Sequence, residues 1–260
     1  MSGAALSGSD VDRYLGRLGE LRPAAPTIES LRRLQRAHLQ AVPFENASVL
    51  RGEPIPLDLP ALVEKVLDRG RGGFCYELNG LFAALLEALG YTVLRRSARV
   101  FGEGTAVGPP FDHLCLEVPI AGARWLADVG FGYSFLEPLR LEVGPEQDDP
   151  AGHFRLVPAP APGGATDVEW LHADGAWRGH YRIEPGVFQL TDFEPACEAL
   201  RTSPDSSFAR GWLLARATAD GYVSISGRQL HLSRGREVVE RRTVEDDAEL
   251  AALVSRWFGL

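Results

Sequence analysis

Three side chains of this chain could together carry out nucleophilic acyl transfer: Cys75, His113 and Asp128. A histidine can take the proton of a thiol, while a carboxylate holds the imidazole in the required tautomer and stabilises its cation. Cys75 follows Arg71-Gly72-Gly73-Phe74, a glycine-bearing turn that is predicted to open into a helix. Because free backbone N–H groups and the positive helix end favour an anion, this position is predicted to lower the pKa of the thiol. The same chemistry serves proteases and transferases, so the residue types alone leave both classes open.

Each of these residues also has a purely structural interpretation. Cys75 could be a small buried residue at a helix start, His113 a hydrogen-bonded core histidine, and Asp128 a cap at the end of a strand. The two other cysteines are weaker candidates for the nucleophile. Cys115 shares a strand face with His113 and is predicted to be buried, and Cys197 has no base nearby in the sequence.

Two predicted strands would bring His113 and Asp128 together. The segment Pro119-Ile120-Ala121-Gly122 is predicted to be a four-residue hairpin loop, which would put Val118 opposite Ala123 and His113 opposite Asp128. Directly opposed residues of an antiparallel pair have Cβ atoms about 4.5–5.5 Å apart on one face of the sheet. A slip of one residue would move the two side chains to opposite faces, so this prediction depends on the register.

The elements around these residues change type along the chain. Apolar residues at three- and four-residue spacings predict three helices, which are bounded by Thr27 and Pro43, by Leu59 and Gly70, and by Cys75 and Gly90. Strands are then predicted at 92–101, 113–118, 124–129, 154–157, 168–172 and 177–183, and again at 222–225, 229–232 and 236–242, before a helix at 245–258. Helices followed by strands and a mixed segment indicate an α+β fold.

Composition narrows the class of protein. The chain has 260 residues, 45% of them hydrophobic and 24% charged, which is typical of a soluble globular protein. It contains no apolar run long enough for a membrane span, and residues 1–10 do not resemble a secretory signal. The net charge is −8 without a basic stripe, which disfavours nucleic-acid binding. Three widely spaced cysteines and the lack of metal-ligand spacings predict a cytoplasmic protein without disulfides or a metal.

Several segments together resemble the arylamine N-acetyltransferases. The stretch 71–80 is similar to the nucleophile motif of that family, and His113 and Asp128 fall where the family places its histidine and aspartate. The matching segments are Tyr14-Leu15-Gly16-Arg17-Leu18-Gly19, Val42-Pro43-Phe44-Glu45-Asn46, Arg71-Gly72-Gly73-Phe74-Cys75-Tyr76-Glu77-Leu78-Asn79-Gly80, Asp128-Val129-Gly130-Phe131-Gly132 and Thr202-Ser203-Pro204-Asp205-Ser206-Ser207-Phe208. Their order and joint presence over most of the chain make the resemblance specific.

The resemblance implies an architecture and a reaction. An N-terminal helical domain (1–90) would carry Cys75, a central antiparallel β-barrel (91–195) would carry His113 and Asp128, and an α/β lid (196–260) would complete a cysteine-protease-like core. Acetyl-CoA would be the cosubstrate of a ping-pong reaction that acetylates Cys75 and passes the acetyl group to an arylamine or hydrazine. The resemblance further implies an acceptor pocket lined by Phe44, Val100, Phe131 and Phe208.

Two departures from the family pattern affect the expected substrates. Tyr133-Ser134-Phe135 stands where the family usually has small residues, and this bulk is expected to narrow the acyl-donor entrance or reshape the acceptor pocket. Asp112 replaces a small hydroxyl residue before His113; it is expected to face away from the pocket while adding charge near the cofactor mouth.

Three alternatives to the acetyltransferase remain open at this point. One is an amide synthase of the same family that transfers a larger, polyketide-type acyl group to an arylamine. The others are a thiol hydrolase of the papain or transglutaminase type and a non-catalytic binding protein on the same scaffold. The oligomeric state is left open.

Overall fold

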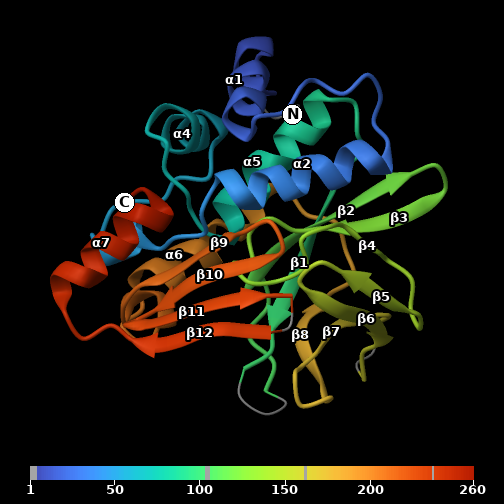
Figure 1. Cartoon of the computed structure of the whole chain (residues 1–260). Coiled ribbons are helices and arrows are strands. Elements are labelled where there is room, and N and C mark those ends of the chain that lie inside the picture. Colours follow the sequence, from blue (N-terminus) through green and yellow to red (C-terminus); the bar gives the residue numbers. More distant parts are fainter. Residues whose placement is uncertain (1–4, 103–105, 161–162, 236) are drawn as a thin grey trace.

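A computed structural model describes residues 5–102, 106–160, 163–235 and 237–260. The chain has an α+β fold with N-terminal helices, a nearly closed antiparallel barrel and a further sheet, as predicted (Figure 1). The helices are α1 (Gly8–Leu18), α2 (Ile28–Ala41), α3 (Ala47–Leu50), α4 (Leu59–Val63), α5 (Cys75–Ala88), α6 (Glu194–Thr202) and α7 (Asp247–Phe258). A π-helical turn, Glu64–Asp68, extends α4, and 3₁₀ turns lie at Leu190–Phe193 and Ser207–Ala209. Within the described residues, no helix is both long and apolar enough to cross a bilayer.

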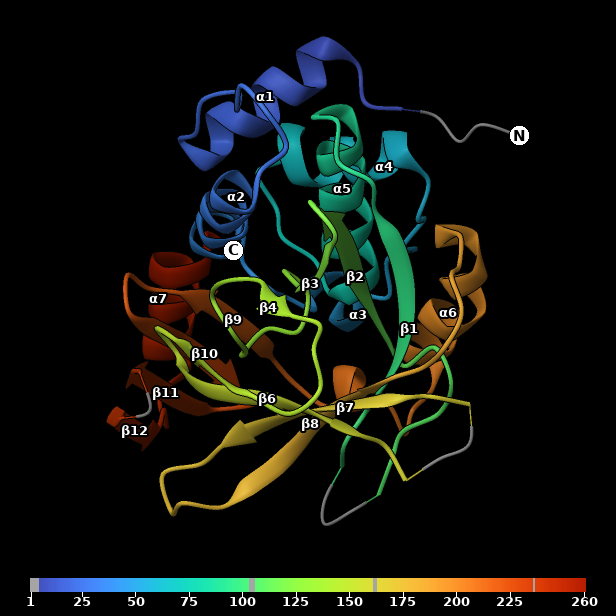
Figure 2. The same cartoon turned by 90° about the vertical axis from the view of Figure 1, so that its right-hand side faces the viewer.

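The N-terminal helices enclose α5. Twelve residues of α5, from Cys75 to Leu86, are buried, so this helix is surrounded on all sides. Figure 2 shows α5 beside β2, with α2 on one side and α4 on the other. Helix α2 begins where predicted, because the Thr27 hydroxyl accepts a hydrogen bond from the Ser30 N–H in a capping box. His38 on α2 is fully buried, and its Nδ1 lies 2.7 Å from the Tyr14 hydroxyl.

The larger sheet has eight antiparallel strands in the order β4-β3-β2-β1-β8-β7-β6-β5. The strands are β1 (Leu94–Val100), β2 (His113–Ile120), β3 (Ala123–Ala127), β4 (Leu139–Arg140), β5 (Glu146–Asp149), β6 (Gly152–Pro158), β7 (Thr166–Leu171) and β8 (Trp177–Ile183). Six of these match predicted strands. Two strands were not predicted: β4 has only two residues, and the sequence of β5, Glu-Gln-Asp-Asp, has low strand propensity.

The predicted register of the β2–β3 hairpin is wrong by two positions. Val118 pairs with Trp125 instead of Ala123, and the loop contains only Ala121 and Gly122. Both loop residues have positive φ angles, 48° and 81°, as a type I′ turn requires. Alanine rarely adopts this conformation, so the turn has no strong sequence signal. Because the shift is even, the face on which each side chain lies does not change.

The C-terminal part of the chain forms a second, four-stranded sheet. Its strands β9 (Leu213–Ala217), β10 (Gly221–Ser226), β11 (Gln229–Arg234) and β12 (Glu237–Thr243) pair in sequence order, and apolar side chains of α7 pack on them. β9 was not predicted. The Phe44 N–H donates to Ala215 O (2.8 Å), and the Ala215 N–H donates to Phe44 O (3.0 Å). This pair of hydrogen bonds joins the C-terminal sheet to the segment that follows α2. The domain boundaries near residues 90 and 195 stay a prediction.

Candidate active site

Cys75 is the first residue of α5 and is only 4% exposed. The glycines before it permit close packing, because a Cβ on Gly72 would lie 1.9 Å from Pro43 O and one on Gly73 would lie 2.6 Å from Glu77 Oε2. Glu77 Oε2 also accepts the Phe74 N–H at 3.2 Å. The first N–H groups of α5, starting with that of Cys75, have no acceptor within the helix. They are therefore suited to an anion that develops beside the sulfur.

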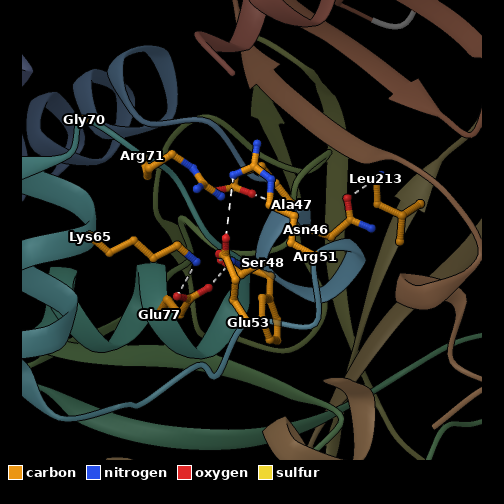
Figure 3. A network of polar contacts seen from close by, with 12 residues as sticks. Asn46, Ala47, Ser48, Arg51, Glu53, Lys65, Gly70, Arg71, Glu77 and Leu213 are labelled. Atoms are coloured by element: carbon orange, nitrogen blue, oxygen red, sulfur yellow. Dashed lines mark hydrogen bonds and ion pairs between the residues drawn. The ribbon is translucent and has the colours of Figure 1, made fainter. Parts of the chain in front are cut away.

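Buried ion pairs hold the segment before Cys75 in place (Figure 3). Lys65 Nζ lies 2.6 Å from Glu77 Oε1, and the Glu77 side chain is only 1% exposed. Arg71 Nη2 lies 2.8 Å from Oε1 of Glu45, whose side chain is fully buried. The other Glu45 oxygen accepts the Ala47 N–H at 2.6 Å. Since breaking a buried pair leaves an uncompensated charge, these contacts hold the turn firmly against α5.

His113 and Asp128 form a buried pair, as predicted. His113 Nε2 lies 2.7 Å from Asp128 Oδ2, and both residues are only 2% exposed. Burial raises the pKa of Asp128, but the charge and hydrogen bond of His113 and the donors Asn79 and Gly130 outweigh it, so the pKa lies below its ordinary value. Asp128 therefore stays ionised and orients the ring, which leaves Nδ1 as the nitrogen free for proton transfer.

Asn79 connects this pair to the helix that bears Cys75, a role that was not predicted from the sequence. It lies one turn after Cys75 on α5, and its Nδ2 donates to Asp128 Oδ1 (2.9 Å) and Leu114 O (2.6 Å). Its Oδ1 accepts the Val129 N–H at 2.9 Å. The only available signal was its spacing of four residues from Cys75, which places both side chains on one face of a helix.

Gly130 brings the β3 end directly against the nucleophile. Its N–H donates to Asp128 Oδ1 at 2.9 Å. A Cβ at this position would lie 2.6 Å from Cys75 Cα and 2.7 Å from Asn79 Nδ2. The backbone of Cys75 therefore lies in contact with the residue two positions after Asp128.

The predicted lowering of the Cys75 pKa is wrong for this state of the protein. Burial raises the pKa of the thiol well above its usual value, and a backbone hydrogen bond from Leu114 opposes this shift. The structure describes both Cys75 and His113 and contains no hydrogen bond between the sulfur and the ring. Catalytic hydrogen bonds often tighten only when substrate is bound.

The four residues expected to line an acceptor pocket lie at three places: Phe44 and Phe208 near Phe74, Phe131 against His113, and Val100 on β1. The ring of Phe208 lies 5.2 Å from that of Phe74 and 6.2 Å from that of Phe44, measured between centroids. Phe131 is edge-on to His113 at 5.2 Å. Val100 lies on β1, two residues beyond the partner of His113 in the β1–β2 pair. Phe131 therefore lies against the candidate base, and Phe208 lies between Phe74, the residue before Cys75, and Phe44. Their role as a substrate pocket stays a prediction.

Tyr133 and Phe135, which depart from the family pattern, both pack against other aromatic side chains. Phe135 is fully buried in the barrel core, edge-on to Phe154. Tyr133 packs between the barrel and the second sheet, with its ring 5.0 Å from Trp170 and 4.9 Å from Tyr222. Phe135 therefore fills the barrel core, while Tyr133 joins the two sheets.

The Asp112 carboxylate turns back onto β1, where it accepts the Val100 N–H at 3.2 Å. It also lines a cavity of about 360 Å³ that is bounded by Tyr76 and by Ala196 and Ala199 of α6. Burial raises its pKa. Among the residues that the structure describes, no group of three or more histidine, cysteine or acidic side chains is arranged to hold a metal.

Comparisons with known proteins agree with this fold. A model of the N-acetyltransferase family matches residues 27–260. The arylamine N-acetyltransferase / N-hydroxyarylamine O-acetyltransferase of Salmonella typhimurium is 36% identical over 95% of this chain and 87% of its own length. Its solved structure superposes with a TM-score of 0.89 at 34% identity, covering 98% of this chain and 92% of that one.

Two further relatives bear on the substrates. Proansamycin X synthase of Amycolatopsis mediterranei is 34% identical over 95% of this chain and 96% of its own length. The Mycobacterium marinum arylamine N-acetyltransferase, solved in complex with CoA, has a TM-score of 0.86 at 31% identity and covers 96% of this chain and 92% of that one. The fold and these similarities define an acyltransferase. The chain belongs to the arylamine N-acetyltransferase family.

Proposed function

We propose that this protein is an acetyl-CoA-dependent arylamine or hydrazine N-acetyltransferase that works through an acetyl-Cys75 intermediate. The observation that carries the proposal is the buried His113–Asp128 pair, which Asn79 ties to the helix that begins at Cys75. The relative solved with CoA supports a CoA thioester as the donor. All three cysteines are free thiols, which fits the reducing cytoplasm that we propose as its location.

The first half-reaction acetylates the sulfur. His113 Nδ1 takes the Cys75 proton as the sulfur attacks the carbonyl carbon of acetyl-CoA, and a sulfur–carbon bond forms. The carbonyl oxygen becomes an oxyanion, which accepts hydrogen bonds from the free N–H groups at the start of α5. The oxyanion then collapses, the bond to the CoA sulfur breaks, and the imidazolium returns its proton to the departing CoA thiolate. Asp128 stabilises the imidazolium throughout.

The second half-reaction transfers the acetyl group. The amine nitrogen attacks the thioester carbon, His113 takes a proton from that nitrogen, and Cys75 leaves as a thiolate that is reprotonated by His113. The raised pKa of the resting thiol agrees with a mechanism in which the proton moves to His113 during attack. The burial of Cys75 would also protect its thioester, because a buried thioester is shielded from water.

Intact-mass measurement tests the first half-reaction. Incubation with acetyl-CoA should add one acetyl group to the wild-type chain and none to Cys75→Ala. Cys115→Ala and Cys197→Ala are matched controls, because both remove another buried thiol and should leave the adduct unchanged. An adduct that persists in Cys75→Ala, or no adduct in any form, would refute the proposal.

An amide synthase is the second candidate function, and the similarity to proansamycin X synthase favours it specifically. Such an enzyme would form the same Cys75 thioester with a larger acyl group. Rates of Cys75 acylation should be compared for acetyl-CoA and for long polyketide-type acyl thioesters of N-acetylcysteamine. A clear preference for the long acyl group would identify the synthase, whereas a preference for acetyl would support the acetyltransferase.

A further inference from the structure

A second cavity, of about 560 Å³, lies between the end of α3, the C-terminal sheet and α7. Its walls are formed by Arg51, Arg210, Gly211, Trp212, Gly227, Arg228, Asp247, Leu250, Ala251, Val254 and Leu260. These residues all belong to the described part of the chain, and Cys75, His113 and Asp128 are not among them. The volume is within the usual range of small-molecule sites, about 300–1,000 Å³. This cavity is therefore separate from the candidate active site.

The arginines of the cavity differ in how far their donors are used. Arg228 is committed to the protein, because its guanidinium contacts Asp247 (2.7 Å), Val244 O (2.8 Å) and Glu245 O (2.6 Å). Within the described structure, Arg210 donates only through Nη2, to Asp205 O at 3.0 Å. Arg51 has only a loose ion pair, at 3.9 Å, with Glu53. Two guanidinium groups thus keep free N–H donors at this cavity, in a chain whose net charge is −8.

Apart from Asp247, whose charge is paired with Arg228 at 2.7 Å, and the two glycines, the rest of the wall is apolar. Leu250 and Val254 of α7 are 8% and 5% exposed, and the indole of Trp212 lies beside them. Apolar ligand surface that packs against such a wall is removed from water, which favours binding. A guanidinium group binds a carboxylate through two parallel hydrogen bonds. A ligand that satisfies both features has one negative group and an apolar body.

We propose that this cavity binds a small amphipathic carboxylate, in which an aryl or medium-length alkyl body lies against Trp212, Leu250 and Val254 while the carboxylate is held by Arg51 and Arg210. The extended polar body of a nucleotide would bury its hydrogen-bonding groups against the apolar wall without partners, which is unfavourable. The carboxylate class follows from this combination of wall and donors.

The site is connected to the surroundings of Cys75. Arg51 ends the short helix that begins after Asn46, and Asn46 Nδ2 donates to Phe208 O and Gly211 O at 2.8 Å each. Arg210 belongs to the same 208–211 segment. A carboxylate shared by Arg51 and Arg210 ties this segment to α3 and so restrains the Phe208 ring. The expected consequence, a changed KM for the acceptor, rests on the proposed function; binding of the carboxylate does not.

Isothermal titration calorimetry of the full chain tests the binding. Octanoate and 2-naphthoate should bind saturably at one site per chain, whereas octanamide, octylammonium and inorganic phosphate should bind at least about tenfold more weakly. Arg51→Ala and Arg210→Ala should each weaken octanoate binding about tenfold, and Arg210→Lys should recover only part of the loss. Arg22→Ala, which removes an exposed arginine that pairs with Asp12 and does not line the cavity, should leave the affinity unchanged.

A second variant keeps the test independent of the arginines. Ala251→Trp places a large side chain into the cavity from an exposed position on α7, so it should abolish octanoate binding while the Tm stays near that of the wild type. Equal binding of octanamide and octanoate, unchanged binding in Ala251→Trp, or displacement of octanoate by acetyl-CoA would overturn the proposal. Acceptor KM is measured separately with and without octanoate. If Cys75 is never acetylated, the proposed function fails while the calorimetry still decides the binding.

Discussion

Asn79 offers the sharpest test of how the candidate site is held together. The side chain is fully buried and makes three hydrogen bonds, to Asp128, Leu114 O and the Val129 N–H. Asn79→Ala leaves two backbone groups and one carboxylate oxygen short of a partner. A neutral hydrogen bond contributes about 0.5–1.5 kcal/mol and one to a charged group about 1.5–3 kcal/mol, so the free energy of unfolding should fall by about 3–5 kcal/mol. That is a large fraction of the stability of an ordinary domain, about 5–15 kcal/mol.

The same substitution should slow the chemistry by releasing Asp128. With Oδ1 held only by the Gly130 N–H, the carboxylate and the His113 ring lose their fixed orientation. A misplacement of about 1 Å can cost about 100-fold in rate, so we expect acetylation of Cys75 to slow by about 10- to 100-fold. Single-turnover intact-mass measurements at saturating acetyl-CoA, repeated across a pH series, give the rate, and urea unfolding gives the stability.

Asn46→Ala is the matched control. Asn46 is 1% exposed and also makes three hydrogen bonds to backbone groups, Phe208 O, Gly211 O and the Leu213 N–H, but it does not contact Asp128. It should lose similar stability and keep the pH profile of Cys75 acetylation. If Asn79→Ala shows the same rate and pH profile as Asn46→Ala, the link from α5 to Asp128 has no catalytic role and the reasoning is wrong.

Three other substitutions probe separate parts of the structure. Asp128→Asn should keep the fold but lower the rate of Cys75 acetylation by about 10³- to 10⁴-fold, as measured by single-turnover mass spectrometry, and a loss below tenfold would contradict the assigned role. Gly130→Ala introduces a Cβ that would lie 2.6 Å from Cys75 Cα; it should lower the free energy of unfolding by about 1–3 kcal/mol in urea titrations and slow acylation. Burial lowers the pKa of His38 from 6.5 to about 3, so as pH falls below 6.5 the unfolded chain binds a proton that the folded chain does not. Stability should therefore fall by about 1.4 kcal/mol per pH unit in that window, and His38→Gln should flatten this slope in urea unfolding between pH 7 and 5.

Much of the helical part could be predicted because its signals are local. The Thr27 side chain caps the start of α2. Cys75 begins α5 shortly after Gly72 and Gly73, where an added Cβ would clash with neighbouring atoms. The missed elements lack such signals. Strand β5 consists of polar residues and forms because β6 lies beside it. Strand β9 was not predicted either, and it pairs with Phe44, which lies far away in the sequence.

The candidate site was predicted by residue type but not by its surroundings. The pKa of the Cys75 thiol depends on burial that only the assembled helices create, so its direction could not be predicted from the position of Cys75 at a helix start. Asn79 lies within the motif at residues 71–80, yet its three partners lie 35–50 residues away along the chain. Long-range contacts of this kind leave no periodic trace in a single sequence.

The pairing of His113 with Asp128 was predicted from a register that proved wrong, and the reason it still holds is geometric. In the observed register His113 would lie opposite residue 130, because Leu116 pairs with Ala127. Asp128 is two positions away from that point, so its side chain is on the same face of the sheet as the histidine. The diagonal separation of such neighbours is about 7–8 Å between backbones, and the two side chains close this gap to a 2.7 Å contact. A one-residue error in the loop would have put the carboxylate on the other face, where no side-chain rearrangement could restore the pair.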